Sequence, residues 1–321
     1  MKPEAPVTPT IINVYLLYWV SLIIQNMQGF IFDTKEWEVV GIDENGYGPL
    51  LGPMVVTGIK VNVKGTDPLT ASEVEGYKFP IPVRDSKELF KRSKGSYRIG
   101  ESVVLTILKM LGGEVSSLQG LINEFSLDMI DLSSYGIADM QIPIFGGFAN
   151  ERLLNYFENC QIKFTDLKFL VLMADKFNQL INSLDNKALL DFKLFTELME
   201  NFDSSYFLMG KIGGTSRYGR FFETLSYDYV VFEERFDYSA YEIKGSRRLY
   251  FIMNGDQKYL PIMFAGIVGK YVREALMFSL SRTLGYEGEI PYASGYFHDS
   301  KTYEVIEKLS PELKDKWVRI R

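Results

Sequence analysis

The sequence predicts an α/β protein built around a mixed sheet. Apolar, β-branched stretches of strand length alternate along the chain with longer segments whose apolar residues recur at helical spacing. Three of the apolar stretches end on acidic residues, and no internal repeat or low-complexity linker interrupts the pattern. Interleaved strands and helices of this kind are typical of a sheet covered by helices.

The first predicted strands form a hairpin. WEVVGID, from Trp37, is a run of β-branched residues that ends on acids, and the Gly/Pro-rich turn NGYGPLLGP follows it. PMVVTGIKVNV then alternates as the second strand. Residues 100–111 have the apolar spacing of a helix, which Gly112 and Gly113 close.

The second half of the chain supplies further strands and a long helix. Residues 113–224 hold helical stretches around 150–158 and 177–200, an apolar run at 169–174 and a glycine-bearing loop at 210–220. YDYVVFEE at 227–234 and LYFIMNGD at 249–256 are predicted strands. A long helix is predicted over 261–282, with Pro261 in its first turn.

The N-terminal segment, residues 1–36, is set apart by its apolar character. Residues 11–24 are apolar at all but Asn13 and Ser21, and no charge occurs between Glu4 and Asp33. The run is short for a membrane span, which needs about 20 apolar residues, and it lacks the small-residue cleavage site of a signal peptide. Two interpretations stay open: a membrane anchor through residues 11–24, or a translation start at Met27.

The composition restricts the chemistry. The single Cys160 excludes an internal disulfide and a cysteine-based zinc site, and it favours a reducing, cytoplasmic setting. The single His298 excludes most Ser-His-Asp, Cys-His and multi-histidine schemes. Any catalysis must therefore depend on carboxylates, hydroxyls, lysines and backbone groups.

The charge distribution permits a polyanionic substrate. The net charge of −6 argues mildly against nucleic-acid binding. Basic residues nevertheless cluster at 84–98, at 244–248 and in the C-terminal tail, 311–321. A nucleic acid is thus a permitted partner, although each cluster alone is typical of a solvated surface.

Acidic residues end three of the predicted strands. Asp43 and Glu44 follow the first, Glu233 and Glu234 end YDYVVFEE, and Asp256 follows LYFIM. Carboxylates gathered at strand ends repel one another unless hard cations neutralise them, and Mg²⁺ or Mn²⁺ prefers oxygen ligands. Two such ions about 3.5–4 Å apart can activate water and stabilise the leaving oxygen of a phosphoryl displacement.

Four segments resemble the type 2 ribonucleases H. VVGIDENGYGPLLGPMVVTG is similar to the family's opening, in which Gly-Ile-Asp-Glu precedes a Gly-x-Gly-Pro turn and a Gly-Pro-Val-Val strand. RDSKEL at 84–89 resembles its Asp-Ser-Lys-x-Leu segment. NGDQKYLPIMFAGIVGKYVREALM resembles its Gly-Asp strand end and following helix, and SGYFHDSKTYEVIEKL resembles its late Gly-Tyr segment. The motifs occur in the family's order.

The resemblance implies a ribonuclease H-like fold over residues 37–310, with a mixed five-stranded sheet flanked by helices and a large, mostly helical insertion at 113–224. It implies two divalent ions, Mg²⁺ or Mn²⁺, held by four carboxylates: Asp43, Glu44, Glu233 and Asp256. It also implies substrate contacts from the glycine turn, two lysines, a serine and a late tyrosine: Gly46, Tyr47, Gly48, Ser86, Lys87, Lys270 and Tyr296.

The fourth carboxylate has rivals. The family's equivalent strand ends Val-x-x-Asp, and YVVFE puts Glu233 in that register. Glu234 is its neighbour and would point to the other face of a strand. Asp175 ends FLVLMAD but lies much further from Asp256 in the chain than the family's spacing implies.

The chain departs from the family at several positions. Tyr47 stands where the family has Arg or Lys, and Gly266 replaces a serine that opens the helix after the metal site. The loop at 210–220 is a candidate phosphate nest, with a flexible surface loop as the alternative. His298 is expected to be an exposed loop residue near the site.

The sequence therefore predicts a metal-dependent endonuclease that cuts the RNA strand of RNA–DNA hybrids or ribonucleotides embedded in DNA. Two alternatives keep the fold. One is a non-catalytic nucleic-acid-binding protein in which Tyr47, Gly266 and Glu233 mark lost activity. The other is a related nuclease acting on structured DNA.

Overall fold

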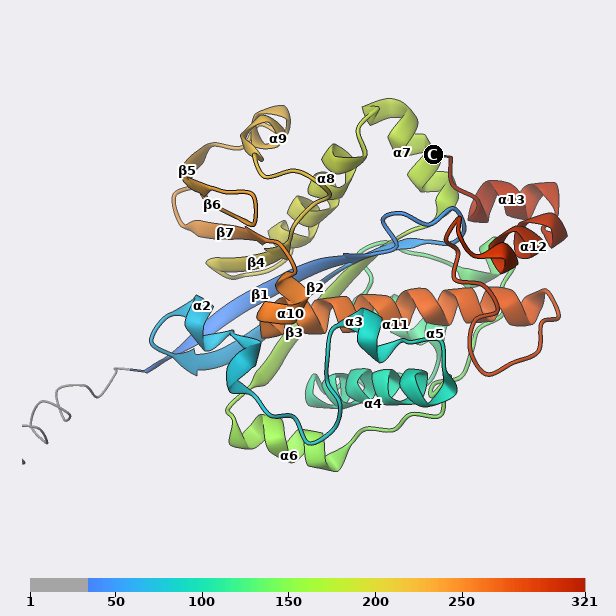
Figure 1. Ribbon diagram of the computed structural model, residues 1–321, viewed down its shortest axis with the longest axis horizontal. Coiled ribbons are helices and arrows are strands. Elements are labelled where there is room, and N and C mark those ends of the chain that lie inside the picture. The colour runs from blue at the N-terminus through green and yellow to red at the C-terminus, as the bar shows by residue number, and fades with distance from the viewer. Residues whose placement is uncertain (1–33, 321) are drawn as a thin grey trace, which may run out of the picture.

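The computed structural model describes residues 34–320 (Figure 1). The apolar run at 11–24 and Met27 lie outside the described residues. The strands are β1 (Lys35–Asn45), β2 (Met54–Gly65), β3 (Lys163–Leu172), β4 (Tyr206–Gly210), β5 (Tyr229–Glu234), β6 (Tyr238–Ile243) and β7 (Arg247–Ile252). The helices of the first half are α2 (Pro68–Ala71), η1 (Val74–Gly76), α3 (Ser86–Leu89), α4 (Lys94–Met110), α5 (Leu118–Phe125), η2 (Leu132–Tyr135) and α6 (Glu151–Asn159). Those of the second half are α7 (Ala174–Leu184), α8 (Lys187–Glu200), α9 (Gly219–Thr224), α10 (Gly255–Lys258), α11 (Leu260–Thr283), α12 (Ser300–Lys308) and α13 (Pro311–Trp317).

The strands form a single mixed sheet in the order β3-β2-β1-β4-β7-β6-β5. β1 pairs antiparallel with β2 and parallel with β4, and β4 pairs parallel with β7. The predicted α/β class, with a mixed sheet flanked by helices, is confirmed. The sheet has seven strands rather than five, because the β5–β6 hairpin extends it beyond β7.

Residues 113–224 hold most of their regular structure in helices, as predicted, and they also supply two strands of the sheet. β3 lies at one edge of the sheet, and β4 lies in its interior between β1 and β7. β4 has only five residues, YFLMG, and a short apolar run cannot be distinguished from a buried helical segment by periodicity. The segment that resembles no family motif therefore supplies a central strand.

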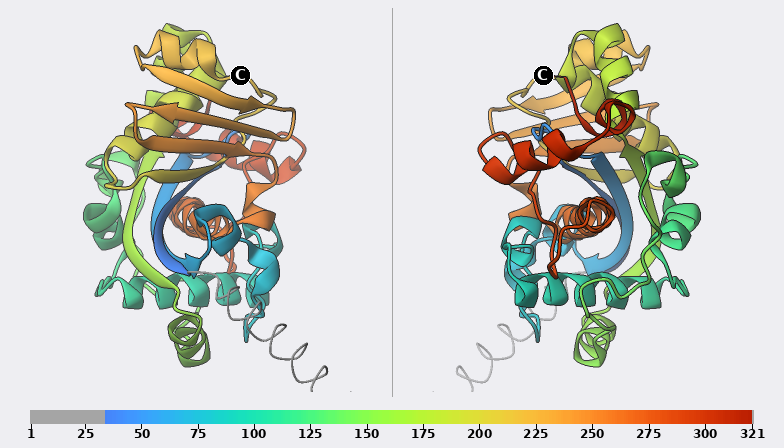
Figure 2. Two further views of the ribbon diagram at one scale, coloured as in Figure 1. Left: turned by 90° about the vertical axis from the view of Figure 1, so that its left-hand side faces the viewer. Right: turned by 90° about the vertical axis from the view of Figure 1, so that its right-hand side faces the viewer.

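Helices cover the two faces of the sheet and create two cores. α11 packs with α4 and one face of β1, β2 and β3, and Figure 2 shows the sheet curving around α11. Residues of α8 and α9 pack on the opposite face, where Val40 and Ile42 of β1 contribute. Because successive strand residues point to opposite faces, Asp43 belongs to the α11 side and Glu44 to the α8 side.

The C-terminal segment is part of the folded domain rather than a solvated basic tail. α13 ends on Trp317, whose side chain is fully buried. The indole of Trp317 donates a hydrogen bond to the carbonyl of Tyr135 at 2.9 Å. Arg319 is also buried, and its contacts lie under the loop that follows β1. The domain thus continues past residue 310.

Within residues 34–320, no helix combines the length and apolar character that a membrane crossing requires.

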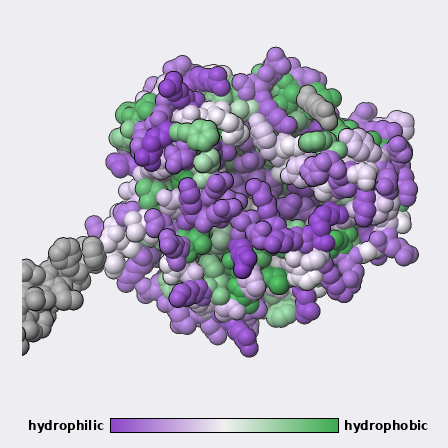
Figure 3. Space-filling view, in the orientation of Figure 1, coloured by the Kyte–Doolittle hydropathy of each residue, from purple (hydrophilic) through white to green (hydrophobic). Residues whose placement is uncertain are grey.

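The face seen in Figure 1 is hydrophilic over much of its centre (Figure 3).

Candidate active site

A pocket of about 450 Å³ lies where β1, β4 and β7 end. β1, β4 and β7 run parallel, so their carboxyl ends meet at one edge, where α/β folds commonly place their sites. Ten of the eleven residues predicted for the site line this pocket: Asp43, Glu44, Gly46, Tyr47, Gly48, Ser86, Lys87, Asp256, Lys270 and Tyr296. Segments far apart in the sequence therefore meet as the four motifs predict.

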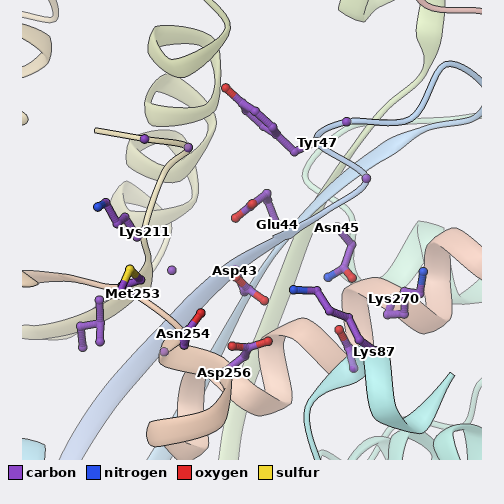
Figure 4. Close-up of a pocket in the computed structure, with 18 of the residues that line it drawn as sticks. Asp43, Glu44, Asn45, Tyr47, Lys87, Lys211, Met253, Asn254, Asp256 and Lys270 are labelled. Carbon is purple, nitrogen blue, oxygen red and sulfur yellow. The ribbon is translucent and has the colours of Figure 1, made fainter. Parts of the chain in front are cut away.

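Asp43 and Glu44 diverge from the end of β1. Figure 4 shows Asp43 directed toward Lys87 and Asp256, and Glu44 directed to the other side of the strand. Asp43 lies against α11, where the residue at position 266 has no side chain. A Cβ at Gly266 would lie 2.6 Å from Oδ2 of Asp43. The glycine that replaces the family's serine therefore leaves the space that this carboxylate occupies.

Burial dominates the electrostatics of these two acids. Desolvation raises the pKa of Asp43 well above its ordinary value, and the neighbouring Glu44 and Asp256 raise it further, while Lys87 opposes them. Desolvation likewise raises the pKa of Glu44 well above its ordinary value, with Asp191 as the largest charged contributor. A protein with no cation at this site would hold protons on these carboxylates at a pH where exposed acids are ionised.

Asp256 and Lys87 complete the α11 side of the site. Asp256 follows β7 in the first turn of α10, and burial raises its pKa, with Lys87 opposing and Asp85 adding to the shift. Lys87 lies in the first turn of α3, where the Asp85 carboxylate accepts hydrogen bonds from the backbone of Lys87 and Glu88. The cap fixes the direction of α3 and thereby the position of the lysine.

Asp191 of α8 is a further carboxylate near the site, and the sequence patterns do not single it out. Its side chain is fully buried on the Glu44 side of the sheet, between the core residues Leu190 and Phe192. Burial raises the pKa of Asp191 well above its ordinary value, and Asp43 adds to the shift. The signal was an acid flanked by apolar residues in a predicted helix, which does not by itself distinguish a site from a solvated helix face.

The structure does not bring Glu233 to the pocket. It lies on the edge strand β5 and pairs with Arg235 at 3.2 Å. Glu234 accepts a hydrogen bond from the Tyr241 hydroxyl at 2.5 Å, and Asp175 accepts one from Tyr135 at 3.4 Å. The strand that reaches the site between β1 and β7 is β4, and it ends on Gly210 without an acid.

Two buried arginines donate hydrogen bonds to carbonyls in and after the glycine turn that follows β1. Gly46 has a φ of +87°, which favours glycine. Arg319 donates to the carbonyls of Gly46 at 2.5 Å and Gly52 at 2.9 Å, and Arg273 donates to the carbonyl of Pro53 at 3.2 Å. Burial, with Arg273 nearby, lowers the pKa of Arg319 to about 9. The C-terminus thus fixes the carbonyl direction in this turn.

Tyr47 is half-buried in the same turn, and it packs toward α8. The ammonium of Lys187 lies 5.0 Å from the centre of its ring. Burial, followed by the charges of Asp191 and Glu44, raises the pKa of Tyr47 to about 12. The phenol is therefore protonated at neutral pH and available as a hydrogen-bond donor.

The remaining predicted residues occupy the rim. Lys270 pairs with Glu274 at 2.8 Å, and Tyr296 stacks on His298 with ring centroids 5.5 Å apart. Tyr296 adjoins the glycine turn, since a Cβ at Gly48 would lie 3.8 Å from its ring. Of the basic residues in the loop at 210–220, Lys211 lines the pocket, whereas Arg217 and Arg220 line a separate surface pocket.

The acids suit a hard divalent cation by their chemistry and surroundings. All supply oxygen ligands, neither side-chain oxygen of Asp191 has a hydrogen-bond partner among residues 34–320, and Gly210 and Gly266 leave the space that the Asp43 carboxylate occupies. In the part of the chain that the structure describes, no three acid, histidine or cysteine side chains converge as a finished metal site. Lys87 projects toward the space beside Asp43 in Figure 4.

Comparison with known proteins finds local similarity to ribonuclease HII. No protein-family model matches the chain. The chain is 36% identical over 59 residues to ribonuclease HII of Methanococcus vannielii, a match that covers 18% of this chain and 20% of that protein. It is 31% identical over 74 residues to ribonuclease HII of Methanococcus maripaludis, covering 23% and 27%. The chain is similar to the type 2 ribonucleases H. The matched segments span about a fifth and about a quarter of the length of these curated relatives.

Solved structures show a distant likeness. Ribonuclease HII of Archaeoglobus fulgidus, in a complex with PCNA, has 15% identity and a TM-score of 0.43, covering 88% of this chain and 94% of that one. Ribonuclease H2 of Pyrococcus horikoshii has 14% identity and a TM-score of 0.42, covering 86% and 91%.

Proposed function

We propose that the protein is a metal-dependent endonuclease that hydrolyses a phosphodiester in the RNA strand of an RNA–DNA hybrid or at ribonucleotides embedded in DNA. The observation that carries this proposal is the pocket in which Asp43, Glu44 and Asp256 meet the glycine turn. Partly desolvated acids beside lysines and a glycine turn suit a phosphate-bearing substrate and a cation better than a neutral ligand.

Asp43, Glu44 and Asp256 would hold Mg²⁺ or Mn²⁺, in a site for two ions. When bound, such ions lower the pKa of water and stabilise charge on the leaving oxygen. Desolvation of Asp43 and Glu44 strengthens their attraction for a cation, because the surroundings screen the charges poorly. Lys87 and Lys270 line the same pocket and would neutralise the phosphates on either side of the scissile bond.

The glycine turn and Tyr296 would contact the ribose. The pocket lining includes Gly46, Tyr47, Gly48 and Tyr296. Two of the three turn residues are glycines, so no side chain covers their backbone groups. A 2′-hydroxyl is both a donor and an acceptor, so backbone groups and a phenol can distinguish RNA from DNA at this position. Ser86 lies close to Asp43 and Gly266 and would orient the neighbouring phosphate.

The test is a cleavage assay with end-labelled RNA–DNA hybrid, DNA–DNA duplex and a duplex with a single ribonucleotide, each with Mg²⁺ or Mn²⁺. We expect cleavage of the ribonucleotide-containing substrates and none of DNA–DNA. Cleavage of DNA–DNA would contradict the specificity for ribonucleotides and favour the alternative of a related nuclease acting on DNA. Tight binding without cleavage would favour the non-catalytic alternative and contradict the proposal.

A matched pair of variants controls for contaminating nucleases. Asp43→Asn keeps the size of the side chain and removes its charge, and Glu197→Gln makes the same change at an exposed position of α8. The activity should disappear in the first and persist in the second. Cleavage that is indifferent to Asp43 would come from another protein in the preparation.

A further inference from the structure

Asp191 is a buried acid that the fold leaves without a partner. Its side chain is 0% exposed, and no donor within residues 34–320 forms a hydrogen bond with its Oδ1 or Oδ2. An ionised carboxylate in such surroundings costs several kcal/mol unless it is paired, hydrogen-bonded or bound to a metal. A position between Leu190 and Phe192 in a helical core would be filled more favourably by an apolar residue.

Lys187, the cation one helical turn before Asp191, lies over aromatic rings. Lys187 precedes Asp191 by one helical turn, so the two side chains lie on the same face of α8. The Lys187 ammonium instead lies over two rings, 5.0 Å from the centre of Tyr47 and 5.5 Å from that of Phe177. None of the ion pairs found in residues 34–320 includes Asp191.

Gly210, at the end of β4, lies beside both carboxylates of β1. A Cβ at this position would lie 2.5 Å from Oδ1 of Asp43 and 3.6 Å from Oε2 of Glu44. The end of β4 therefore carries no side chain that would compete with either carboxylate for space. Glu44 lies on the α8 side of the sheet, which is the side from which Asp191 comes.

We propose that Asp191 is the further carboxylate of the metal site, contributed by α8 from behind the sheet and sharing a cation with Glu44. It takes the place that the family resemblance implies for Glu233, and Gly210 at the end of β4 leaves the space beside Glu44 without a further side chain. The ligand class is a hard divalent cation such as Mg²⁺ or Mn²⁺, because all donors are carboxylate oxygens. This inference rests on the proposed metal-dependent function.

Mn²⁺ binding to the full-length protein tests the assignment without any substrate. Isothermal titration is carried out on the wild-type protein, on Asp191→Asn and on Glu197→Gln, which makes the same change at an exposed position of the same helix. Removing a ligand should weaken Mn²⁺ binding about tenfold or more, since even the supporting residues around a metal contribute this much. Glu197→Gln should bind as the wild type does. Equal affinity in wild type and Asp191→Asn, or no binding by the wild type, would overturn the proposal.

A second measurement does not depend on the folding of a variant. Anomalous scattering from Mn²⁺-soaked crystals of the wild-type protein should place an ion within coordination distance of Asp191, about 2.0–2.6 Å. An ion held by Asp43, Glu44 or Asp256 with Asp191 outside this distance would contradict the assignment.

Cleavage assays on the same preparations separate this inference from the proposed function. Cleavage by a wild-type protein whose Mn²⁺ binding ignores Asp191 would contradict the role of Asp191 alone. Asp191-dependent Mn²⁺ binding by a protein that cleaves no nucleic acid would contradict the nuclease alone.

Discussion

Two groups of carboxylates in the protein differ in their surroundings: Glu101 and Glu274 have polar partners, whereas Asp43, Glu44 and Asp191 gather near the end of β1. Glu101 of α4 accepts hydrogen bonds from the backbone of Phe145 at 2.8 Å and Gly147 at 2.7 Å and from the Tyr271 hydroxyl at 2.9 Å. Near the site at the end of β1 the corresponding acid is Asp191 of α8, which accepts none from the residues that the structure describes. A buried acid whose lone pairs are all used holds the fold together, whereas one with free lone pairs indicates a ligand that the polypeptide does not supply.

Glu274 of α11 extends the comparison. It pairs with Lys270 and Arg273 and accepts a hydrogen bond from Tyr97. Although burial alone would raise its pKa, the two cations and the tyrosine bring the pKa below the ordinary value. The pKa of Asp43, Glu44 and Asp191 shifts the opposite way. Desolvation acts on all four acids, and their partners decide the direction of the pKa shift.

The largest expected effect is on catalysis, at Asp43 in the group near the end of β1. Asp43→Asn should lower the rate of hybrid cleavage by about a thousandfold or more, because a metal supplies several kcal/mol of transition-state stabilisation and each 1.4 kcal/mol is about tenfold. Single-turnover cleavage with Mg²⁺ measures it. A variant that keeps a tenth of the wild-type rate would remove Asp43 from the mechanism.

The next effect is on stability, at Glu274 in the group that has polar partners. Glu274→Ala leaves the buried guanidinium of Arg273 without its carboxylate, and loss of one partner from a buried pair costs about 3–5 kcal/mol. Urea unfolding in EDTA measures the change. A loss below about 1 kcal/mol would show that Glu274 contributes little to the fold.

The pH dependence of stability distinguishes the two groups more finely. Asp191 binds a proton more tightly in the folded than in the unfolded chain, so it stabilises the fold at low pH and loses this contribution as the pH rises from about 3.8 through its raised pKa. The metal-free wild type should therefore lose stability over this range, by about 1.4 kcal/mol for each pH unit that separates the folded-state pKa from the unfolded-state pKa. Asp191→Asn should show a flatter profile in urea unfolding at pH 5 and pH 8. Parallel profiles for the two proteins would contradict a raised pKa at Asp191.

The smallest expected effect is at Glu233. This side chain is part of an exposed pair with Arg235 on an edge strand, and such pairs contribute about 0–1 kcal/mol. Glu233→Gln should leave both the cleavage rate and the urea midpoint close to the wild-type values. A hundredfold loss of cleavage would return Glu233 to the site.

The sequence predicts best those site residues that directly follow the end of a strand. Asp43 and Glu44 directly follow a strand and precede a glycine turn, so local sequence defines both geometry and composition. Asp256 likewise follows β7 within a few residues. The places of these acids in the fold follow from the residues next to them in the chain, so a single sequence is enough to predict them.

The features that the sequence does not predict depend on strand order and on helix rotation. The strand of Glu233 resembles a buried one, yet Val230, Val231 and Phe232 are about half exposed because β5 lies at the edge of the sheet. β4 is too short to be identified by periodicity, and its central position arises from pairing with distant strands. The burial of Asp191 near the site depends on which face of α8 packs against the sheet.

The rate at which the wild-type protein cleaves a ribonucleotide-containing duplex, measured against Mg²⁺ or Mn²⁺ concentration, tests the account most directly. We expect no cleavage in EDTA, recovery on adding either ion, and a dependence on concentration steeper than that of a single binding site, since two ions take part. Cleavage that persists in EDTA, or none at any ion concentration, would contradict the claim that the strand-end acids serve a divalent cation in phosphodiester hydrolysis.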